Sequence, residues 1–339
     1  MARELPLKSF WADLGAEFTE QNGWNIPAVF TDVEAEYYAV HQLAGLLDRS
    51  SRGKVHVSGA DCKDFLNHML TNEINALKPG EGCYAALLTA TGRVLCDMRV
   101  FVFDNFVILD TEPGLESKLI ELLKKYIITE DVEVEDITDR YTLLSLTGPK
   151  APRIIHALLG DDFALPNRFH FKGVVIEGED VLAISDSCTG QNGCEFLIRK
   201  DAAGKVAHAI CEKGKHSGLK PVGYQASEVL RIEAGILRYG IDMDEAVTLP
   251  ETGLEVIAAS ETKGCYPGQE VVAKTATYGG PNKKIEALTF EREQLPGAGE
   301  KICDGSTGKE IGWVTSSAAV VTQERGFALG YIYKKKLGG

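Results

Sequence analysis

Apolar and polar positions along the chain form short blocks that predict a protein of mixed α and β structure. Residues 54–57 and 93–103 alternate with the two-residue period of half-buried strands. Residues 61–70 and 113–126 repeat apolar positions at three- and four-residue spacing, as helices with one buried face do. These blocks predict one unit of strands and helices over residues 51–137.

The same order of strand, glycine turn and helix returns further along the chain. The apolar run 143–146 leads through a glycine-proline pair to a helical pattern over 151–159, and shorter strands and helices follow. We interpret the repeat as a degenerate internal duplication. Residues 1–50 and 138–245 then make up a first α+β unit, and residues 51–137 a second.

The first fifty residues are rich in aromatic side chains and carry one clear helical pattern. Val40, Leu43 and Leu47 fall on one face of a helix predicted over residues 34–47. Most of the aromatic side chains are expected in the core, although some could line a pocket.

The pattern changes in the last part of the chain, residues 246–339. Residues 285–290, 311–315 and 327–333 are short strand patterns separated by glycine and charged turns, with no helical period. The sequence therefore predicts a linker followed by a small all-β module, a barrel.

Composition and charge exclude several classes of protein. The chain has 339 residues and a net charge of −13, which argues against non-specific nucleic-acid binding because such binding needs a basic surface. No apolar run is long enough to span a membrane, and Met1–Phe10 lacks the features of a secretory signal, so we expect a cytoplasmic protein. The eight cysteines form no C-x-x-C pair, which predicts free thiols and no structural metal.

Reactive side chains are densest in the stretch Lys263 to Glu270, which reads Lys-Gly-Cys-Tyr-Pro-Gly-Gln-Glu. Its proline-glycine pair favours a type II turn, so Cys265 is expected at a tight bend. A nearby ammonium, that of Lys263, would favour the thiolate. The alternative is that Cys265 is a small buried hydrophobic residue beside an ordinary turn.

Two carboxylates and an arginine are further candidates. Asp97 shares a strand face with Arg99, and the simplest expectation is that the two form an ion pair. Glu195 follows a glycine-rich turn, and its carboxylate could accept two neighbouring N–H groups of a ligand or face the solvent. Arg231 could bind a ligand or pair with Glu228 on its own helix.

The stretch Lys263–Glu270 resembles the K-G-C-Y-x-G-Q-E signature of the YgfZ family, the folate-binding iron–sulfur maturation proteins, which are relatives of the glycine cleavage T-protein. The match is complete at its fixed positions, Lys263, Gly264, Cys265, Tyr266, Gly268, Gln269 and Glu270. Other segments are similar to T-protein relatives, among them 92–97, 190–195 and 230–235.

The resemblance implies an α+β fold of the T-protein type, with two related α+β units and a small C-terminal β-barrel around a central folate channel. It implies that tetrahydrofolate or a one-carbon derivative lies near Asp97 and Glu195, with Arg231 and Tyr239 as further cofactor-binding residues. Cys265 and Asp97 would be the catalytic groups. A scaffold role is implied for Asp242 and Asp244. Lys274, Lys283 and Lys284 are candidates to bind a glutamate tail, with a solvated charged face as the alternative.

The chain also departs from the T-protein pattern. Cys96-Asp97 stands where T-proteins have two adjacent aspartates, and Ser227-Glu228 replaces an arginine-aspartate pair. These departures favour a YgfZ-like folate-binding protein that acts in iron–sulfur cluster assembly or repair, including that of tRNA-modifying enzymes, with cluster assembly or client proteins as partners. The alternative is a folate-dependent one-carbon transferase, such as aminomethyltransferase or a demethylase. A third possibility is an interaction module without folate. Whether the chain turns over a substrate is left open.

Overall fold

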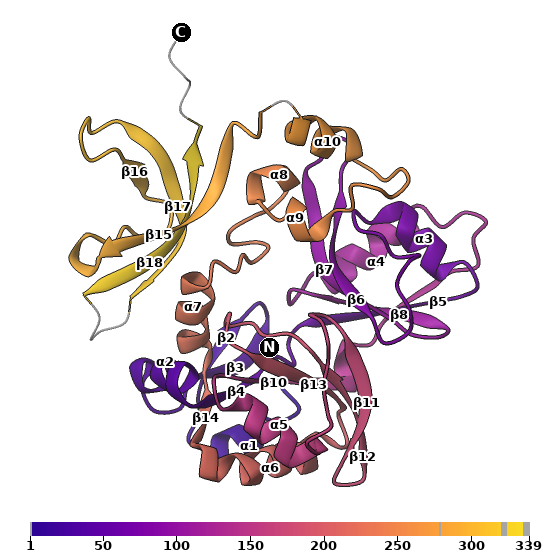
Figure 1. Ribbon diagram of the computed structural model, residues 1–339, viewed down its shortest axis with the longest axis vertical. Helices are drawn as coiled ribbons and strands as arrows, with labels where there is room; N and C mark the ends of the chain where they lie inside the picture. Colours follow the sequence, from indigo (N-terminus) through magenta and orange to yellow (C-terminus); the bar gives the residue numbers. More distant parts are fainter. Residues whose placement is uncertain (1, 278, 320–323, 335–339) are drawn as a thin grey trace.

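The computed structural model has two large sheets and a smaller C-terminal sheet, and helix α7 (Tyr224–Glu233) lies between the C-terminal sheet and the first large sheet (Figure 1). The structure describes residues 2–277, 279–319 and 324–334. Helix α7 contacts strands of the C-terminal sheet on one side and helix α2 (Val33–Gln42) on the other. It therefore links the C-terminal sheet to the rest of the molecule.

The first large sheet has the strand order β11-β12-β13-β10-β4-β14. Its pairs are antiparallel except for β14 with β4, which is parallel. The strands are β4 (Ala44–Asp48), β10 (Tyr141–Thr147), β11 (Phe171–Ile176), β12 (Glu179–Ile184), β13 (Gly193–Arg199) and β14 (Leu219–Val222). The sheet thus joins a strand of the first fifty residues to strands that begin almost a hundred residues later.

Helices cover both faces of this sheet. One face packs on α1 (Lys8–Asp13), α5 (Ala151–Leu159) and α6 (Ala203–Gly214), around the fully buried Trp11 and Phe196. The other face packs on α2 and α7. Burial on both faces explains why the central strands are almost continuously apolar.

The predicted helix over residues 34–47 is corrected by this arrangement, because α2 ends at Gln42 and the following residues form strand β4. Leu46 and Leu47 point to opposite faces of the sheet and enter different core clusters. An apolar run that is buried on both faces gives no period, so it cannot be told from a helix by pattern alone.

The second large sheet has the order β6-β7-β8-β5-β9 and is antiparallel throughout. The strands are β5 (Gly53–Ser58), β6 (Gly82–Leu88), β7 (Val94–Val102), β8 (Phe106–Thr111) and β9 (Glu133–Asp136). Helices α3 (Cys62–Met69) and α4 (Glu116–Lys124) cover one face and bury their apolar sides against it.

An aromatic cluster joins the two large sheets. Phe101 and Ile108 of the second sheet pack with Phe171 and Leu197 of the first, and the rings of Phe101 and Phe171 meet edge to face at 5.7 Å. The space between the two sheets is therefore apolar at this end, and the polar cavity described below lies elsewhere between them.

A small N-terminal sheet lies beside the first large sheet, in the order β1-β3-β2. Its strands are β1 (Arg3–Glu4), β2 (Glu17–Gln21) and β3 (Trp24–Val29). Pro27 of β3 lines the central cavity, as do residues at the end of β2. The first fifty residues are thus more regular than their irregular pattern indicates.

The C-terminal sheet has the order β15-β18-β17-β16 and is antiparallel. Its strands are β15 (Lys283–Glu291), β16 (Lys301–Cys303), β17 (Glu310–Ala319) and β18 (Arg325–Tyr333). In the described part of the chain, β15 and β16 are edges that do not pair with each other, so the predicted closed barrel is not confirmed. Apolar side chains are buried on both of its faces.

Three short helices link the first 248 residues to this sheet, where the sequence predicts only a linker. They are α8 (Leu249–Thr252), α9 (Glu255–Ala258) and α10 (Gln269–Thr277). Thr248 and Glu251 form a capping box at the start of α8. Short 3-10 turns occur at η1 (Thr138–Arg140), η2 (Lys215–Ser217) and η3 (Arg292–Gln294).

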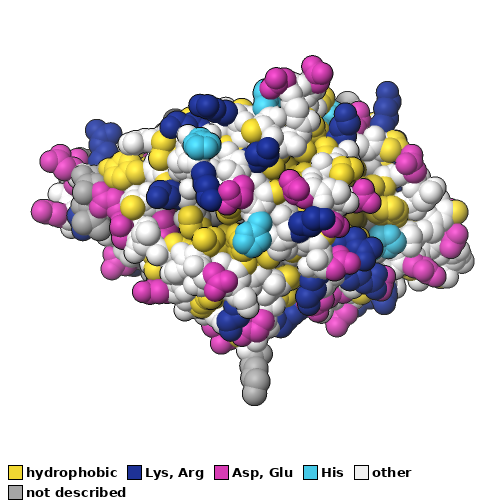
Figure 2. Space-filling view, turned by 90° about the horizontal axis from the view of Figure 1, so that it is seen from below, with side chains coloured by type: hydrophobic (Ala, Val, Ile, Leu, Met, Phe, Trp, Pro, Cys, Tyr) yellow, Lys and Arg dark blue, Asp and Glu magenta, His cyan; other side chains and the backbone are white. Residues whose placement is uncertain are grey.

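The surface seen from below carries both signs of charge. Figure 2 shows basic and acidic side chains interspersed over this face, with hydrophobic side chains between them. The net charge of −13 is therefore not gathered there into a single acidic field.

Candidate functional site

A cavity of about 360 Å³ lies where the two large sheets meet helix α7. Asp97 and Arg99 of β7 line it, together with Glu228 and Arg231 of α7 and Arg49 of the loop after β4. Its size falls in the range of sites for small organic ligands. Segments far apart in the sequence thus bring charged side chains to one enclosed place.

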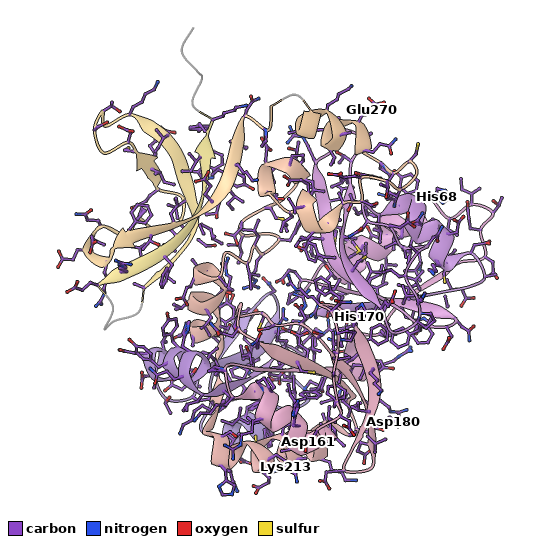
Figure 3. The ribbon with its side chains drawn as sticks, in the orientation of Figure 1. His68, Asp161, His170, Asp180, Lys213 and Glu270 are labelled. Atoms are coloured by element: carbon purple, nitrogen blue, oxygen red, sulfur yellow. The ribbon has the colours of Figure 1, made fainter. Side chains whose placement is uncertain are left out.

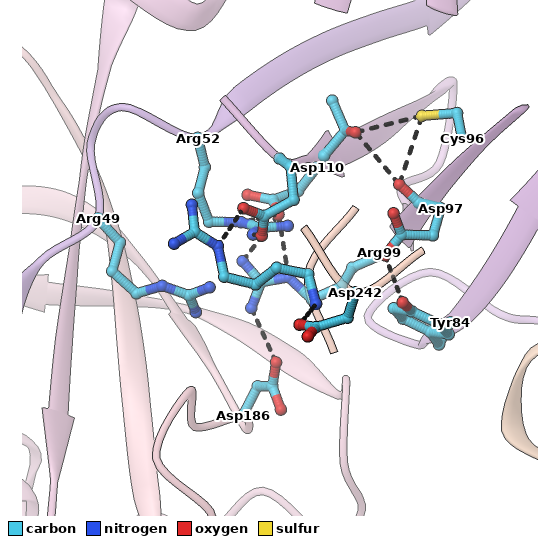
Figure 4. A network of polar contacts seen from close by, with 12 residues as sticks. Arg49, Arg52, Tyr84, Cys96, Asp97, Arg99, Asp110, Asp186 and Asp242 are labelled. Atoms are coloured by element: carbon cyan, nitrogen blue, oxygen red, sulfur yellow. Dashed lines mark hydrogen bonds and ion pairs between the residues drawn. The ribbon is translucent and has the colours of Figure 1, made fainter. Parts of the chain in front are cut away.

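Asp97 is the carboxylate in this cavity with a spare acceptor. The residue is buried, and the O–H of Tyr84 on β6 donates to its Oδ2 (Figure 4). Oδ1 is also buried and has no hydrogen-bond partner among the residues that the structure describes. A buried oxygen without a partner is costly, so Oδ1 is poised to accept a hydrogen bond or a proton from a bound molecule.

Burial also changes the acidity of this group. It raises the pKa of Asp97 to about 6, against the hydrogen bond from Tyr84, which lowers it. The charge of Glu112 adds to the increase. A carboxylate with a pKa near the working pH can both take up and release a proton, as a general acid or base must.

The ion pair predicted between Asp97 and Arg99 is not formed. Arg99 instead pairs with Asp110 at 3.0 Å, with Asp186 at 2.9 Å and with Glu195 at 2.5 Å. The strand pattern placed both side chains on one face correctly, but three other carboxylates surround the guanidinium. Asp97 is left to Tyr84.

Glu195 lies on β13 and is completely buried, but it is not one of the residues that line the cavity. Its Oε2 accepts from Arg99, and its Oε1 pairs with Nη1 of Arg49. Both arginines line the cavity. At this end of the cavity, Glu195 therefore lies behind two guanidinium groups.

The ion pairs continue from Asp110 through Arg52 to a second group of charged residues that line the cavity. Glu112 pairs with Arg52 and, at 3.0 Å, with Arg238, which in turn pairs with Glu228 at 2.7 Å. Burial raises the pKa of Glu112, but the charges of the two arginines outweigh it and lower the pKa to about 2. Glu112 is thus a fixed negative charge beside Asp97.

Lys54 supports the loop that carries Arg49 and Arg52. The side chain is fully buried, and its Nζ donates to the backbone oxygens of Ser50 at 3.1 Å and Arg52 at 2.7 Å. Burial lowers the pKa of Lys54 to about 8. A charged group that binds two carbonyls of a short loop holds both arginines in place.

Sequence reasoning did not single out several of these residues. Arg49, Arg52 and Arg238 lie in polar loops, and Tyr84 is the third residue of β6, which is apolar beyond it. The signal available in the sequence was the pair of arginines in the polar stretch 49–52, directly before the strand predicted over 54–57. That signal does not say which carboxylates the arginines meet.

Arg231 lies near the end of α7 and is buried. It pairs with Glu228 at 2.9 Å, as the alternative from the sequence expected, and also with Asp242 at 2.5 Å. It further donates to the hydroxyl of Ser316 on β17 at 2.8 Å. Arg231 thus lines the cavity and at the same time ties α7 to the C-terminal sheet.

Asp242 is the centre of that junction. Its carboxylate accepts from the hydroxyls of Thr315 and Ser316, at 2.6 Å each, and from the backbone N–H of Arg238. The side chain is almost completely buried. These contacts give Asp242 the geometry of a scaffold residue.

Tyr239 lies outside the cavity, between the β6–β7 hairpin and the C-terminal sheet. Its hydroxyl accepts from Nζ of Lys118 at 3.0 Å and donates to the backbone oxygen of Val94 at 3.3 Å. Burial raises the pKa of Tyr239. These contacts join α4, β7 and the loop after α7.

The ammonium of Lys263 is held by backbone carbonyls at the end of helix α3. Nζ donates to the oxygens of Asn67, of Leu70 at 2.6 Å and of Asn72 at 2.8 Å. Burial lowers the pKa of Lys263 to about 8. The side chain therefore acts as a cap for the last turn of α3 and attaches the Cys265 segment to the second sheet.

The turn after Cys265 is fixed against the β6–β7 hairpin. Gly268 has φ +82°, and a Cβ there would lie 2.6 Å from the backbone oxygen of Thr89 and 2.9 Å from Cα of Gly92. Only glycine allows this approach. Oε1 of Gln269 accepts from the backbone N–H of Tyr266 at 3.2 Å and closes the turn.

Cys265 itself is exposed, and the described residues that line the cavity include none from the Lys263–Glu270 segment. Figure 3 places Glu270 on α10 at the upper edge of the molecule. The three lysines considered for a ligand tail are also outside the cavity lining. Lys274 pairs with Glu270, Lys283 lies over the rings of Trp313 and Tyr331, and Lys284 is 4.0 Å from Glu255.

Across residues 2–277, 279–319 and 324–334, no three histidine, cysteine, aspartate or glutamate side chains are grouped so that they could hold a metal ion. Within the same ranges, no helix combines the length and the apolar character that crossing a membrane requires.

Comparison with known proteins gives a consistent set of matches. The family model described as "GCVT N-terminal domain" matches residues 7–262. An aminomethyltransferase of Caldanaerobacter subterraneus is 29% identical over 336 residues, which cover 98% of this chain and 88% of that protein. An aminomethyltransferase of Clostridium botulinum is 28% identical over 329 residues, which cover 96% of this chain and 88% of that protein.

The fold has a counterpart among solved structures. The crystal structure of glycine cleavage system aminomethyltransferase T from Bartonella henselae superposes with a TM-score of 0.85 at 24% identity. The superposition covers 98% of this chain and 90% of that one. All the sheets described above therefore fall within the shared fold.

Proposed function

We infer the function from the premise that this chain belongs to the GCVT N-terminal domain family. The predicted membership of the T-protein superfamily and its mixed α and β fold are thereby confirmed. The narrower YgfZ assignment is not, and the matched relatives carry the name aminomethyltransferase. We propose that the chain is a folate-dependent one-carbon transferase. One observation carries the proposal, namely the free Oδ1 of Asp97 buried at the cavity.

The cavity fits such a ligand in size and in chemistry. About 360 Å³ suits a small heterocycle with an aromatic linker. A reduced pterin presents N–H donors, and the buried Oδ1 of Asp97 needs one. Apolar side chains such as Ile26 and Leu47 line other parts of the wall. The residues present therefore suit a folate with its reactive nitrogens near Asp97.

Bound tetrahydrofolate would supply two nitrogens that accept the carbon of an aminomethyl donor, while ammonia and the protonated carrier atom of the donor leave, so no electrons are exchanged. The two nitrogens lose two protons in this transfer, and the leaving groups take up two. Asp97 is placed to accept and return such a proton through Oδ1. Its pKa of about 6 leaves it mostly ionised, and able to act as a base, at neutral pH.

The other proposed cofactor-binding residues take supporting roles. Arg231 shapes the wall of the cavity and holds α7 to the C-terminal sheet, and Tyr239 packs behind β7. Glu195 could accept from the N–H groups of a pterin only from behind Arg49 and Arg99. We propose Asp97 as the catalytic residue, Tyr84 as the residue that positions it, and these residues as supports of the cavity around it.

The test is a calorimetric titration of the full chain with tetrahydrofolate, followed by turnover. The donor is a thiol-bound aminomethyl compound, and the product is the methylene form of the folate, detected by absorbance. Micromolar binding with turnover that Asp97→Asn abolishes supports the proposal. Absence of folate binding to the wild-type chain would overturn it.

The second candidate function is a folate-binding factor for assembly or repair of iron–sulfur clusters in other proteins. It is favoured by the exposure of Cys265. Lys263 and Gly268 fix the segment on either side of this thiol. A thiol presented this way suits contact with a partner protein better than chemistry in the cavity.

The two candidates give different results with the Cys265→Ala variant. If the second is correct, cluster-dependent enzymes lose activity in cells that carry only this variant, while folate binding in vitro is unchanged and no turnover is found. If the first is correct, the variant transfers one-carbon units at the wild-type rate.

A further inference from the structure

Two ion pairs at the cavity share the completely buried carboxylate of Glu195, and the two arginines that form them are held very differently. Arg99 is 4% exposed and has two further carboxylates, Asp110 and Asp186, at 3.0 and 2.9 Å. The Arg49 side chain is 19% exposed. Among the described residues, Glu195 is the only ion-pair partner of Arg49.

This asymmetry determines which of the two arginines can leave. Displacing Arg99 would break three buried ion pairs at once, and each lost partner would leave a buried charge uncompensated. Displacing Arg49 breaks one, and its partly exposed side chain lines the cavity, so its guanidinium has room to move there. When Arg49 leaves, Arg99 still pairs with Asp110 and Asp186, so this part of the ion-pair network stays intact.

Loss of Arg49 alone would still leave Oε1 of Glu195 without a partner in a completely buried position. A buried carboxylate oxygen without a partner is strongly unfavourable unless another donor binds it. A ligand in the cavity that brings N–H donors to this end would fill it. The exchange then substitutes one hydrogen bond to the carboxylate for another.

We propose that Arg49 is a displaceable partner of Glu195 and thereby a specificity-determining residue of the cavity. It closes this end to ligands that cannot donate to Glu195 and yields to a heterocycle with adjacent N–H groups, such as a reduced pterin. The inference rests on the proposed function for the identity of the ligand. The displaced guanidinium stays at the cavity, where it can meet a carboxylate of the same ligand.

The probes are tetrahydrofolate and a reduced pterin without the glutamate tail, each titrated by calorimetry into the full chain. Arg49→Met keeps the length and the apolar stem of the side chain but removes the competing charge. Because no ion pair has to break, it binds the reduced pterin between about 5-fold and 100-fold more tightly than wild type does. A merely structural arginine would show weaker binding instead when truncated.

Arg3→Met is the matched control. Arg3 also pairs with a buried carboxylate, Glu116, at 3.5 Å, but it does not line the cavity and makes no contact with Glu195. Its variant is expected to bind the reduced pterin within 2-fold of wild type. The double variant Arg49→Met/Glu195→Gln should lose the gain, because an amide offers one acceptor in place of two.

The outcomes separate this inference from the proposed function. Folate binding to wild type without any gain in Arg49→Met overturns the role of Arg49 and leaves the proposed function in place. No binding of either probe to any variant overturns both. If Arg49→Met does not fold, as judged by circular dichroism, Arg49→Lys serves instead. It is expected to give a smaller gain of the same sign, and equal or weaker binding would overturn the role of Arg49.

Discussion

The central cavity and the segment Lys263–Glu270 hold the two sets of candidate reactive groups, and they are built in opposite ways. The cavity collects side chains from distant segments, buries them and leaves one oxygen of Asp97 without a partner in the described structure. The segment keeps its reactive groups contiguous in sequence, but the fold separates them. Lys263 faces three backbone carbonyls, whereas Cys265 faces the solvent.

The difference shows how environment, more than residue type, makes a group reactive. Burial raises the pKa of Asp97 into the range where a proton can be exchanged. The ammonium of Lys263 is already bound by the end of helix α3, and so is not free to serve a thiolate. The cavity is therefore better suited to acid–base chemistry, and the segment is better suited to a structural role and to contact with partners.

The largest expected effect is that of Asp97→Asn on one-carbon transfer. Removing a positioned general base costs about 10²- to 10⁴-fold in rate, whereas Cys265→Ala, outside the cavity, should stay within 2-fold. In the wild type the rate should rise with pH up to about 6 and then level off, because Asp97 must be ionised to act as a base. Initial rates between pH 5 and 8 measure both effects.

A reversed result would overturn the comparison. If Cys265→Ala abolishes transfer and Asp97→Asn leaves it intact, the chemistry belongs to the segment. The fall in transfer rate at low pH is an independent check, since the Cys265→Ala variant should show it as well.

The next effect is on stability and concerns Lys263. Lys263→Met removes three hydrogen bonds to carbonyls and leaves the end of α3 without its cap, which costs about 1.5 to 3 kcal/mol in free energy of unfolding. Lys274→Met is the control, because Lys274 forms only an exposed pair with Glu270, and its change should be below about 0.5 kcal/mol. Urea denaturation measures both. Equal stability of the two variants would mean that the carbonyl contacts are not stabilising.

Much of the fold was predictable from the sequence because its strands and helices carry clear periods. The helix predicted over 151–159 is helix α5, and the strand predicted over 93–103 contains β7. Strand β4 was missed because it is buried on both faces and shows no period. The α10 helix was missed because its short pattern follows a proline-glycine turn that indicates a loop.

The site was predictable only as far as residue types and motifs allow. Asp97 could be singled out from the sequence, but its partner could not, because Tyr84 lies on the neighbouring strand and register is not encoded locally. The partners of Glu195 could not be foreseen either. Arg49 and Arg99 come from separate strands and loops, and only the packing of the two sheets brings them together.

Asp97→Asn is expected to raise the free energy of unfolding, by an amount similar to or slightly smaller than the loss expected for Lys263→Met. The pKa of Asp97, about 6, lies above its value in an unfolded chain, so the native state binds more protons between about pH 4 and 6. Stability from this group is therefore present at low pH and is lost as pH rises through about 6. The asparagine amide does not ionise, so the variant loses no stability as the pH rises. It should be about 1 to 3 kcal/mol more stable than wild type at pH 7.5.

The pH dependence tests the cause of that gain. The difference between the two proteins should shrink toward zero near pH 4, where both side chains are neutral. A gain that is constant with pH would indicate better packing of the amide, and a loss at pH 7.5 would mean that the carboxylate is stabilised by its surroundings. Urea denaturation at pH 4, 5.5 and 7.5 distinguishes these results.

The smallest effect is expected for Cys265→Ser, and it tests the separation of the two regions most directly. Cys265 and Cys303 are exposed, whereas Cys96 beside Asp97 is buried, and burial raises the pKa of Cys96 to about 12. A thiol reagent should therefore react quickly with the two exposed cysteines and slowly with Cys96, and the substitution should remove one of the fast thiols. Folate affinity should change by less than 2-fold in the variant, because the segment does not line the cavity in the described structure. A larger change would show that the turn fixed by Gly268 on the β6–β7 hairpin transmits its position along β7 to Asp97, and that the two regions act as one site.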